Sequence, residues 1–177
     1  MIENTVLDAL KTRRSIRKYK KEQITDEELE AVLEAGTYAP TGMGYQDPWI
    51  VAVQNPELRA KISEMNRIIW GHDVDPFYGA PTIVLVFASN PGKWANSVYD
   101  GSLVLGNMMN AAYAIGLGSC WINREREMFS TPEGEALMKE MGLPEGLIGI
   151  GALALGYPEE VPQHAKARKE NYYRIIK

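Results

Sequence analysis

The sequence has little that supports a disulfide framework, a metal cluster or a membrane span. Its single cysteine, Cys120, excludes internal disulfides and fits a reducing cytoplasm. Two histidines, His72 and His164, are too few and too far apart for an ordinary zinc or iron site. Residues 102–117, the most apolar stretch, are too short and too interrupted by glycine and asparagine to cross a bilayer. Residues 1–14 lack a signal-peptide pattern, so we predict a cytoplasmic protein.

Several signature motifs are also absent. There is no G-x-G-x-x-G opening a βαβ unit, no G-x-x-x-x-G-K-[ST] loop and no G-x-S-x-G turn, so Rossmann, P-loop and serine-hydrolase sites lack support. C-x-x-C pairs and H-E-x-x-H are missing too, and we expect no metal site. The composition that remains, 45% hydrophobic and 24% charged, is typical of a globular protein. A length of 177 residues fits one domain over residues 1–177.

Positive charge is concentrated at the two ends of a chain whose net charge is -4. Residues 11–21 hold seven of the 19 lysines and arginines, and residues 164–177 hold five more. This pattern favours a local anionic ligand over a nucleic acid, which usually needs a broad basic face. The alternative is a non-enzymatic basic-ended binding module, which steep salt dependence on a polyanion would identify.

Hydrophobic periodicity predicts a mixed fold in which helices outnumber strands. Buried strands are predicted at residues 49–54, 82–88, 119–122 and 147–155. Helices are predicted at residues 4–10, after a capping box at Thr25 and Glu28, after Asn55-Pro56, over 99–115 and after a capping box at Ser130 and Glu133. Residues 66–80 are predicted to be a loop.

Two segments indicate a second subunit. Helix 99–115 is apolar nearly all round, so it is predicted to be buried on every side, in the core or against another chain. The polar tail after Pro158 carries Tyr172, Tyr173 and two isoleucines, which are hard to leave in water. A tail of this kind often docks on a partner chain, and we predict a homodimer.

Two arginine- and lysine-containing segments can bind an anion. Arginine forks match phosphate oxygens, and alternation in an extended stretch sends Arg13, Ser15 and Arg17 to one side. Lys166 and Arg168 place two further cations one residue apart. Taken singly, each segment also fits an ordinary solvated basic stretch.

Two further segments can approach a flat heterocycle. In residues 39–49, Gly42 permits close approach of the backbone, and Gln46 offers an amide to a heterocyclic edge. In residues 116–123, the backbone after a helix end can donate to a ligand. Both also fit plain connections. Cys120 lies in the second segment without a nearby histidine, which favours a small buried hydrophobe over a nucleophile.

In this order and spacing, the four segments resemble the nitroreductase family of FMN enzymes, in its compact branch. The resemblance rests on RRSIRKY, APTGMG, DGSLVLGNMMNAAYAIGLGSCWI and ALALGYP followed by KAR, and it spans nearly the whole chain. It implies an α+β fold, with a central, mainly antiparallel sheet wrapped by helices. It also implies an intertwined homodimer that holds FMN at each interface.

The resemblance also implies roles for individual residues. The phosphate, ribityl chain and ring edge of FMN would meet Arg13, Arg14 and Ser15, with Lys166 and Arg168 at the phosphate and Arg17 near N1 and the C2 carbonyl. The other subunit would contribute Pro40, Thr41, Gly42, Met43 and Gln46. Backbone groups of Ile122 and Asn123 would face N5 and the C4 carbonyl, with Asn66 near the ring.

The implied reaction passes hydride from NADH or NADPH through flavin N5 to a small organic acceptor, such as a nitroaromatic or a quinone. No catalytic side chain is required, although Arg17 would stabilise negative charge on the reduced ring. Gly44 stands where the family commonly has asparagine, and Asp47 separates Gln46 from Pro48, so the substrate pocket is expected to differ. The alternative is a flavoprotein with another reaction, such as reductive dehalogenation or dehydrogenation of a metabolite.

Overall fold

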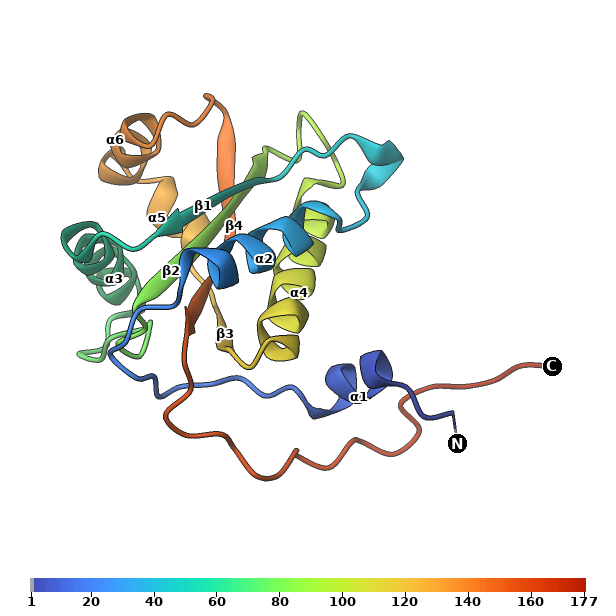
Figure 1. Ribbon diagram of the computed structural model, residues 1–177. Coiled ribbons are helices and arrows are strands. Elements are labelled where there is room, and N and C mark those ends of the chain that lie inside the picture. Colours follow the sequence, from blue (N-terminus) through green and yellow to red (C-terminus); the bar gives the residue numbers. More distant parts are fainter. Residues whose placement is uncertain (1) are drawn as a thin grey trace.

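The computed structural model describes residues 2–177. A four-stranded antiparallel sheet lies at the centre of the fold (Figure 1). The strands are β1 (Trp49–Val53), β2 (Thr82–Ser89), β3 (Gly118–Ile122) and β4 (Leu147–Gly156). The helices are α1 (Thr5–Thr12), α2 (Asp26–Thr37), α3 (Pro56–Trp70), α4 (Ser97–Ala114), α5 (Glu125–Phe129) and α6 (Pro132–Glu140), with a 3-10 turn η1 (Gly42–Gly44). The strand order is β1-β2-β4-β3. The α+β class and antiparallel sheet are confirmed.

The two middle strands form the centre of the core. Every residue of β2 is buried, as its continuous apolar run predicts. The prediction of a buried strand at residues 49–54 was wrong in its burial, because β1 is an edge strand in which only Val53 is buried. Trp49 at its start is 46% exposed.

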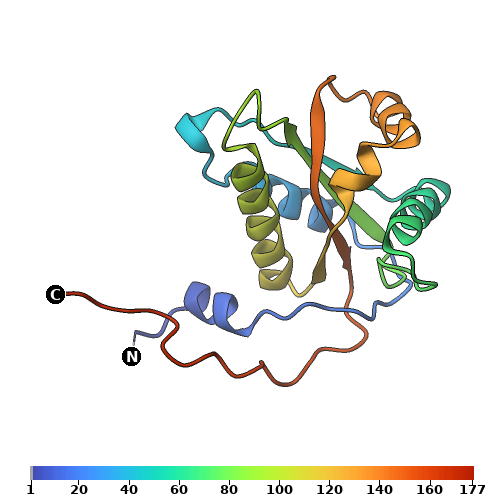
Figure 2. The same cartoon turned by 180° about the vertical axis from the view of Figure 1, so that it is seen from behind.

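Helices cover both faces of the sheet, and Figure 2 shows the arrangement from behind. Ile62 of α3 and Phe129 of α5 belong to an apolar cluster on one face. Val32 of α2 and Met108 of α4 belong to a second cluster on the other face. Alternate residues of β2 contribute to each cluster, because successive side chains of a strand point to opposite faces.

Helix starts follow the predicted capping chemistry with one exception. At α2 the Thr25 side chain accepts a hydrogen bond from the Glu28 N–H, and the Glu28 carboxylate accepts one from the Thr25 N–H. The predicted cap at Ser130 was wrong, because the Thr131 side chain accepts from the Gly134 N–H and begins α6. Ser130 instead ends the short helix α5.

Helix α3 is longer than predicted, and α5 was not predicted at all. Helix α3 runs through Asn66, the predicted start of a loop, and ends where Gly71 adopts a left-handed φ of 72°. Met65 and Asn66 are buried, so packing extends the helix past its clear apolar pattern. Helix α5 spans five residues, which is too short to show a helical period.

Within one chain, α4 is buried on one face, whereas the tail after β4 is exposed. One face of α4 is buried through Leu105 and Met108, whereas Tyr99 is 68% exposed on another face. Residues 159–177 contain no helix or strand, and both views show this tail running alongside the N-terminal segment (Figures 1 and 2). Within residues 2–177, no helix is long and apolar enough to cross a bilayer.

Candidate functional site

The basic segment at residues 13–17 is held in an extended form against β3. The Ile16 N–H donates to the Ser119 carbonyl over 3.0 Å, and the Tyr19 hydroxyl donates to the Ile16 carbonyl over 2.9 Å. The Ile16 side chain is buried so close to Gly118 that a Cβ there would lie 2.8 Å from it. The segment is therefore a fixed strand-like edge and not a free basic loop.

Three side chains of this segment lie around the buried thiol of Cys120. Burial raises the pKa of the Cys120 thiol, while nearby Arg17, Ser15 and Arg13 act in the opposite direction. Alternation predicts the same grouping of these three residues on one side. A buried thiol with a raised pKa is a poor nucleophile, which agrees with the interpretation of Cys120 as a small hydrophobe.

Two arginine donors of the segment are buried without an acceptor. Nη1 of Arg13 and Nε of Arg14 have no hydrogen-bond partner within the described residues 2–177. Nη1 of Arg14 donates to the carbonyls of Lys11 and Arg13 over 2.9 and 2.8 Å, which fixes the direction of its guanidinium. An unmet charged donor costs roughly 1–3 kcal/mol or more, so the arrangement suits a ligand that supplies anionic oxygens.

A second group of unmet donors lies at the other end of β3. The buried Asn66 side chain donates to the Asn123 carbonyl over 2.7 Å and accepts from Nη1 of Arg124 over 3.3 Å. In the part of the chain that the structure describes, the backbone N–H groups of Asn123 and Arg124 have no acceptor. Because Asn66 holds the carbonyl of their shared peptide, the Arg124 N–H points away from Asn66, where a ligand edge can meet it.

The loop from Pro40 to Pro48 is fixed by two carboxylates of its own chain. Asp100, buried in the first turn of α4, accepts from the Gly42 N–H over 2.9 Å and from the Trp94 indole N–H over 2.8 Å. Asp47 accepts from the backbone N–H and the hydroxyl of Ser89 over 2.9 and 2.6 Å. The extra Asp47 noted in the sequence thus anchors the loop to the end of β2.

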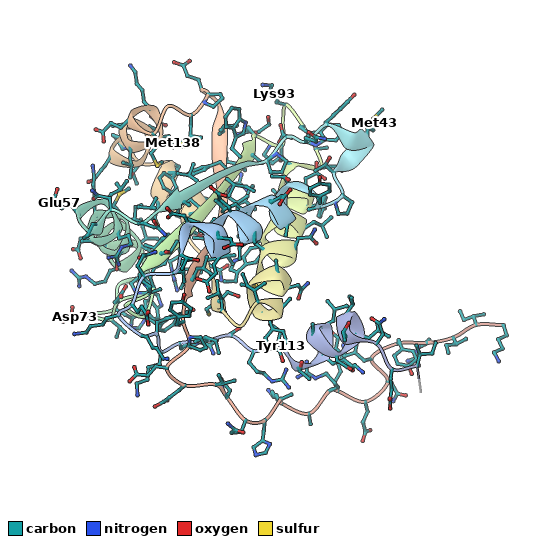
Figure 3. All side chains as sticks on the ribbon, viewed as in Figure 1. Met43, Glu57, Asp73, Lys93, Tyr113 and Met138 are labelled. Carbon is teal, nitrogen blue, oxygen red and sulfur yellow. The ribbon has the colours of Figure 1, made fainter. Side chains whose placement is uncertain are left out.

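This loop presents its side chains outward, at the end of α4 remote from the basic segment. Met43 is 81% exposed with a φ of 54°, and Figure 3 shows it near the opposite end of α4 from Tyr113. The Tyr113 hydroxyl lies 2.8 Å from the Thr12 hydroxyl, next to the basic segment. The helix from Asp100 to Tyr113 rises over thirteen steps of about 1.5 Å, or about 20 Å, so one chain keeps the two segments apart.

The C-terminal tail starts beside the basic segment. The Lys20 N–H donates to the Tyr157 carbonyl, and the Glu159 N–H donates to the Lys18 carbonyl. Further along, Lys166 and Arg168 are exposed, and Arg168 donates to the Lys166 carbonyl. The two basic ends of the sequence therefore share one side of the molecule.

Comparison with known proteins decides the family. The sequence model of the nitroreductase family matches residues 10–72 and 68–157. The chain belongs to the nitroreductase family. A solved nitroreductase with bound FMN from Bacteroides fragilis is 32% identical and superposes with a TM-score of 0.90, covering 99% of this chain and 100% of that one.

Two curated relatives extend the likeness to sequence. A Methanothermobacter thermautotrophicus protein, which carries the name NADH dehydrogenase/NAD(P)H nitroreductase, is 32% identical over 89% of this chain and 79% of its own length. The FMN reductase [NAD(P)H] of Bacillus subtilis is 27% identical over 96% of this chain and 75% of its own length. Both alignments span most of both chains.

Sequence reasoning missed three residues that organise the site. Asp100 lies inside an apolar helix, and its role depends on a loop 58 residues away. The anchoring bonds of Asp47 depend on the end of another strand. Arg124 has a left-handed φ of 85°, which nothing in its neighbouring residues signals. Only Asp47, as an insertion, carried a visible sign.

Proposed function

We propose that this member of the nitroreductase family is an FMN-dependent oxidoreductase that passes hydride from NADH or NADPH to a small organic acceptor such as a nitroaromatic or a quinone. The observation that carries the proposal is the pair of buried, unpartnered donors on Arg13 and Arg14 beside β3. In a family with FMN-bound structures, these donors match a phosphate.

The donor set along β3 fits FMN from end to end. Arg13, Arg14 and Ser15 lie where β3 begins, and we assign them to the phosphate, ribityl chain and ring edge. The free N–H groups at Asn123 and Arg124, where β3 ends, suit the acceptor atoms of a heterocyclic edge. A strand rises about 3.3 Å per residue, so these ends are roughly 13 Å apart, which suits an elongated ligand.

The remaining predicted residues complete the proposed site. The set consists of Arg17 near N1 and the C2 carbonyl, Ile122 and Asn123 at N5 and the C4 carbonyl, Asn66 near the ring, and Lys166 and Arg168 at the phosphate. Bound FMN supplies the hydride-accepting N5 atom. Arg17 would supply a positive charge that favours the reduced, negatively charged ring. The side chains bind and orient, and no triad or metal is needed.

We also propose that the active form is a homodimer. A second copy would bring Pro40, Thr41, Gly42, Met43 and Gln46 to the site, since one chain holds that loop about 20 Å from the basic segment. A groove of about 1000 Å³ lies between α1 and α4, bordered by Val6, Leu10 and Ala111. The exposed Tyr172, Tyr173 and isoleucines of a partner's tail are apolar enough to fill it.

Colour and reduction test the proposed function. The purified protein is expected to be yellow, to release its flavin on denaturation, and to bleach when NADH or NADPH is mixed with it without oxygen. Arg17→Ala is expected to weaken FMN binding and to make the midpoint potential more negative, because a cation beside the reduced ring is lost. A colourless protein that ignores added FMN contradicts the proposal. An unchanged potential contradicts the role of Arg17.

A further inference from the structure

Arg124 has a backbone conformation that arginine rarely adopts. Its φ of 85° and ψ of 7° lie in the left-handed region, at the residue that precedes α5. That conformation is disfavoured for a residue that carries a side chain, compared with glycine. The side chain forms no capping hydrogen bond to the helix that could offset this cost. The contacts that the side chain makes elsewhere therefore bear on why an arginine occupies this position.

The Arg124 guanidinium is held in place from α3. Its central carbon lies 4.7 Å from the centroid of the Trp70 ring, a cation–π contact. Its Nη1 donates over 3.3 Å to the Asn66 side chain, whose amide also holds the Asn123 carbonyl. The cation is therefore fixed beside the two backbone N–H groups that we assign to the flavin edge.

No carboxylate neutralises this cation. Within residues 2–177, Arg124 takes part in no ion pair, and only one of its donors has a protein acceptor. Burial raises the pKa of the adjacent Glu125 to about 8, against the opposing effect of Arg124, so this carboxyl is a weak counter-charge at neutral pH. Half-buried and unpaired, the Arg124 guanidinium keeps donors free for an outside acceptor.

We propose that Arg124 is a specificity residue that binds an anionic oxygen group, carboxylate or phosphate, on the molecule that docks against the flavin. This rests on the proposed function. Arginine binds either group through paired hydrogen bonds, and Trp70 limits the directions that its fork can take. The group can belong to the acceptor, as a carboxylate, or to the reductant, as the 2′-phosphate of NADPH.

Steady-state kinetics of the holoenzyme separate these two sources. The acceptor arm compares 4-nitrobenzoate with neutral 4-nitrobenzamide, and the reductant arm compares NADPH with NADH. In Arg124→Gln, kcat/KM is expected to fall about 10- to 100-fold for the charged member of one pair, mainly through KM, because a charge-assisted contact is lost. The neutral member is expected to change less than about twofold, and Arg124→Lys is expected to recover part of the loss.

Two further variants test whether the effect of Arg124→Gln comes from a general loss of structure. Arg126→Gln removes the same charge from an exposed residue of α5 and is expected to change neither arm. Arg124→Gly relieves the strained φ, which offsets the lost contacts with Trp70 and Asn66, so it is expected to fold while losing the same selectivity. Equal changes for charged and neutral members in both arms would overturn the inference.

The proposed function has its own readout in this design. A wild type that binds no FMN overturns the proposed function and this inference together. A second outcome overturns this inference alone. In it, the wild type is yellow and is reduced by NADH or NADPH, but Arg124→Gln and Arg124→Gly keep the wild-type ratios of kcat/KM between the charged and neutral members of both pairs.

Discussion

The regions at the two ends of α4 differ in which of their groups lack a partner. At the C-terminal end, the segment at residues 13–17 is packed firmly on β3, yet donors of Arg13 and Arg14 lack acceptors. At the N-terminal end, the loop at residues 40–48 has its polar groups met by Asp47 and Asp100, yet Met43 is exposed. The first region suits an anion and the second suits an apolar surface, which is why we propose that each chain contributes to two different sites in a dimer.

The largest effect is expected from removing both unmet arginines. Arg13→Ala combined with Arg14→Ala deletes two charged contacts of about 1.5–3 kcal/mol each, which predicts a rise of at least about 100-fold in the Kd for FMN. Quenching of flavin fluorescence measures it. Lys20→Ala, an exposed cation of the same stretch, serves as the control and is expected to keep wild-type affinity. Equal affinities for all three proteins would remove the distinction between the two regions.

A charge at Met43 tests the other half. Met43→Asp places a carboxylate where we expect the second copy to pack, and a buried unpaired charge costs several kcal/mol, so dimer affinity is expected to fall about 100-fold. FMN is expected to be lost with it, while the folded monomer survives. Analytical ultracentrifugation measures the association. Val74→Asp, which charges another exposed apolar position, is expected to leave the dimer intact.

Because of buried Glu125, we expect the free energy of unfolding to fall as pH rises from about 5 to 7.5. Burial raises the pKa of its carboxyl from 4.5 to about 8, so the folded state binds more protons than the unfolded state between these values. Stability from this group is therefore present at low pH and is lost as pH rises towards 8, by roughly 3 kcal/mol between about pH 5 and pH 7.5. Glu125→Gln is expected to flatten this loss in urea unfolding at several pH values.

An identical pH dependence in Glu125→Gln and wild type would show that the carboxyl is ionised and hydrogen-bonded in the folded protein.

The loop carboxylate of Asp47 is expected to behave in the opposite way. Asp47→Ala is expected to lower the free energy of unfolding by about 1–2 kcal/mol, because the two bonds to Ser89 are lost. Thermal melts measure the change. Neutralising the buried Glu125 thus stabilises at high pH, whereas removing Asp47 from the loop destabilises.

Local patterns predicted much of the fold and one grouping of side chains in the candidate site. The all-apolar β2, the capping box at Thr25 and the one-sided grouping of Arg13, Ser15 and Arg17 follow from spacing and propensity, and the structure has all of them. The roles of these residues toward FMN, and the single domain over residues 1–177, stay predictions.

Most of the features that the sequence did not predict depend on contacts between residues far apart in the chain. Burial of Asn66 extends α3 beyond its periodic pattern. The cap at Thr131, by contrast, has a local cause, since Pro132 follows it at the first helical position. The left-handed Arg124 is held by α3, which is remote in sequence. Nothing in a short window of residues encodes such long-range packing.

Sedimentation velocity monitored at flavin absorbance tests most directly whether two copies share each FMN. The account predicts that the flavin sediments with a particle of twice the 19.8 kDa chain mass, and that Met43→Asp sheds flavin as it dissociates. A particle of one chain mass that keeps its flavin would contradict the two-copy site. Protein that sediments without flavin, even after FMN is added, would contradict the whole account.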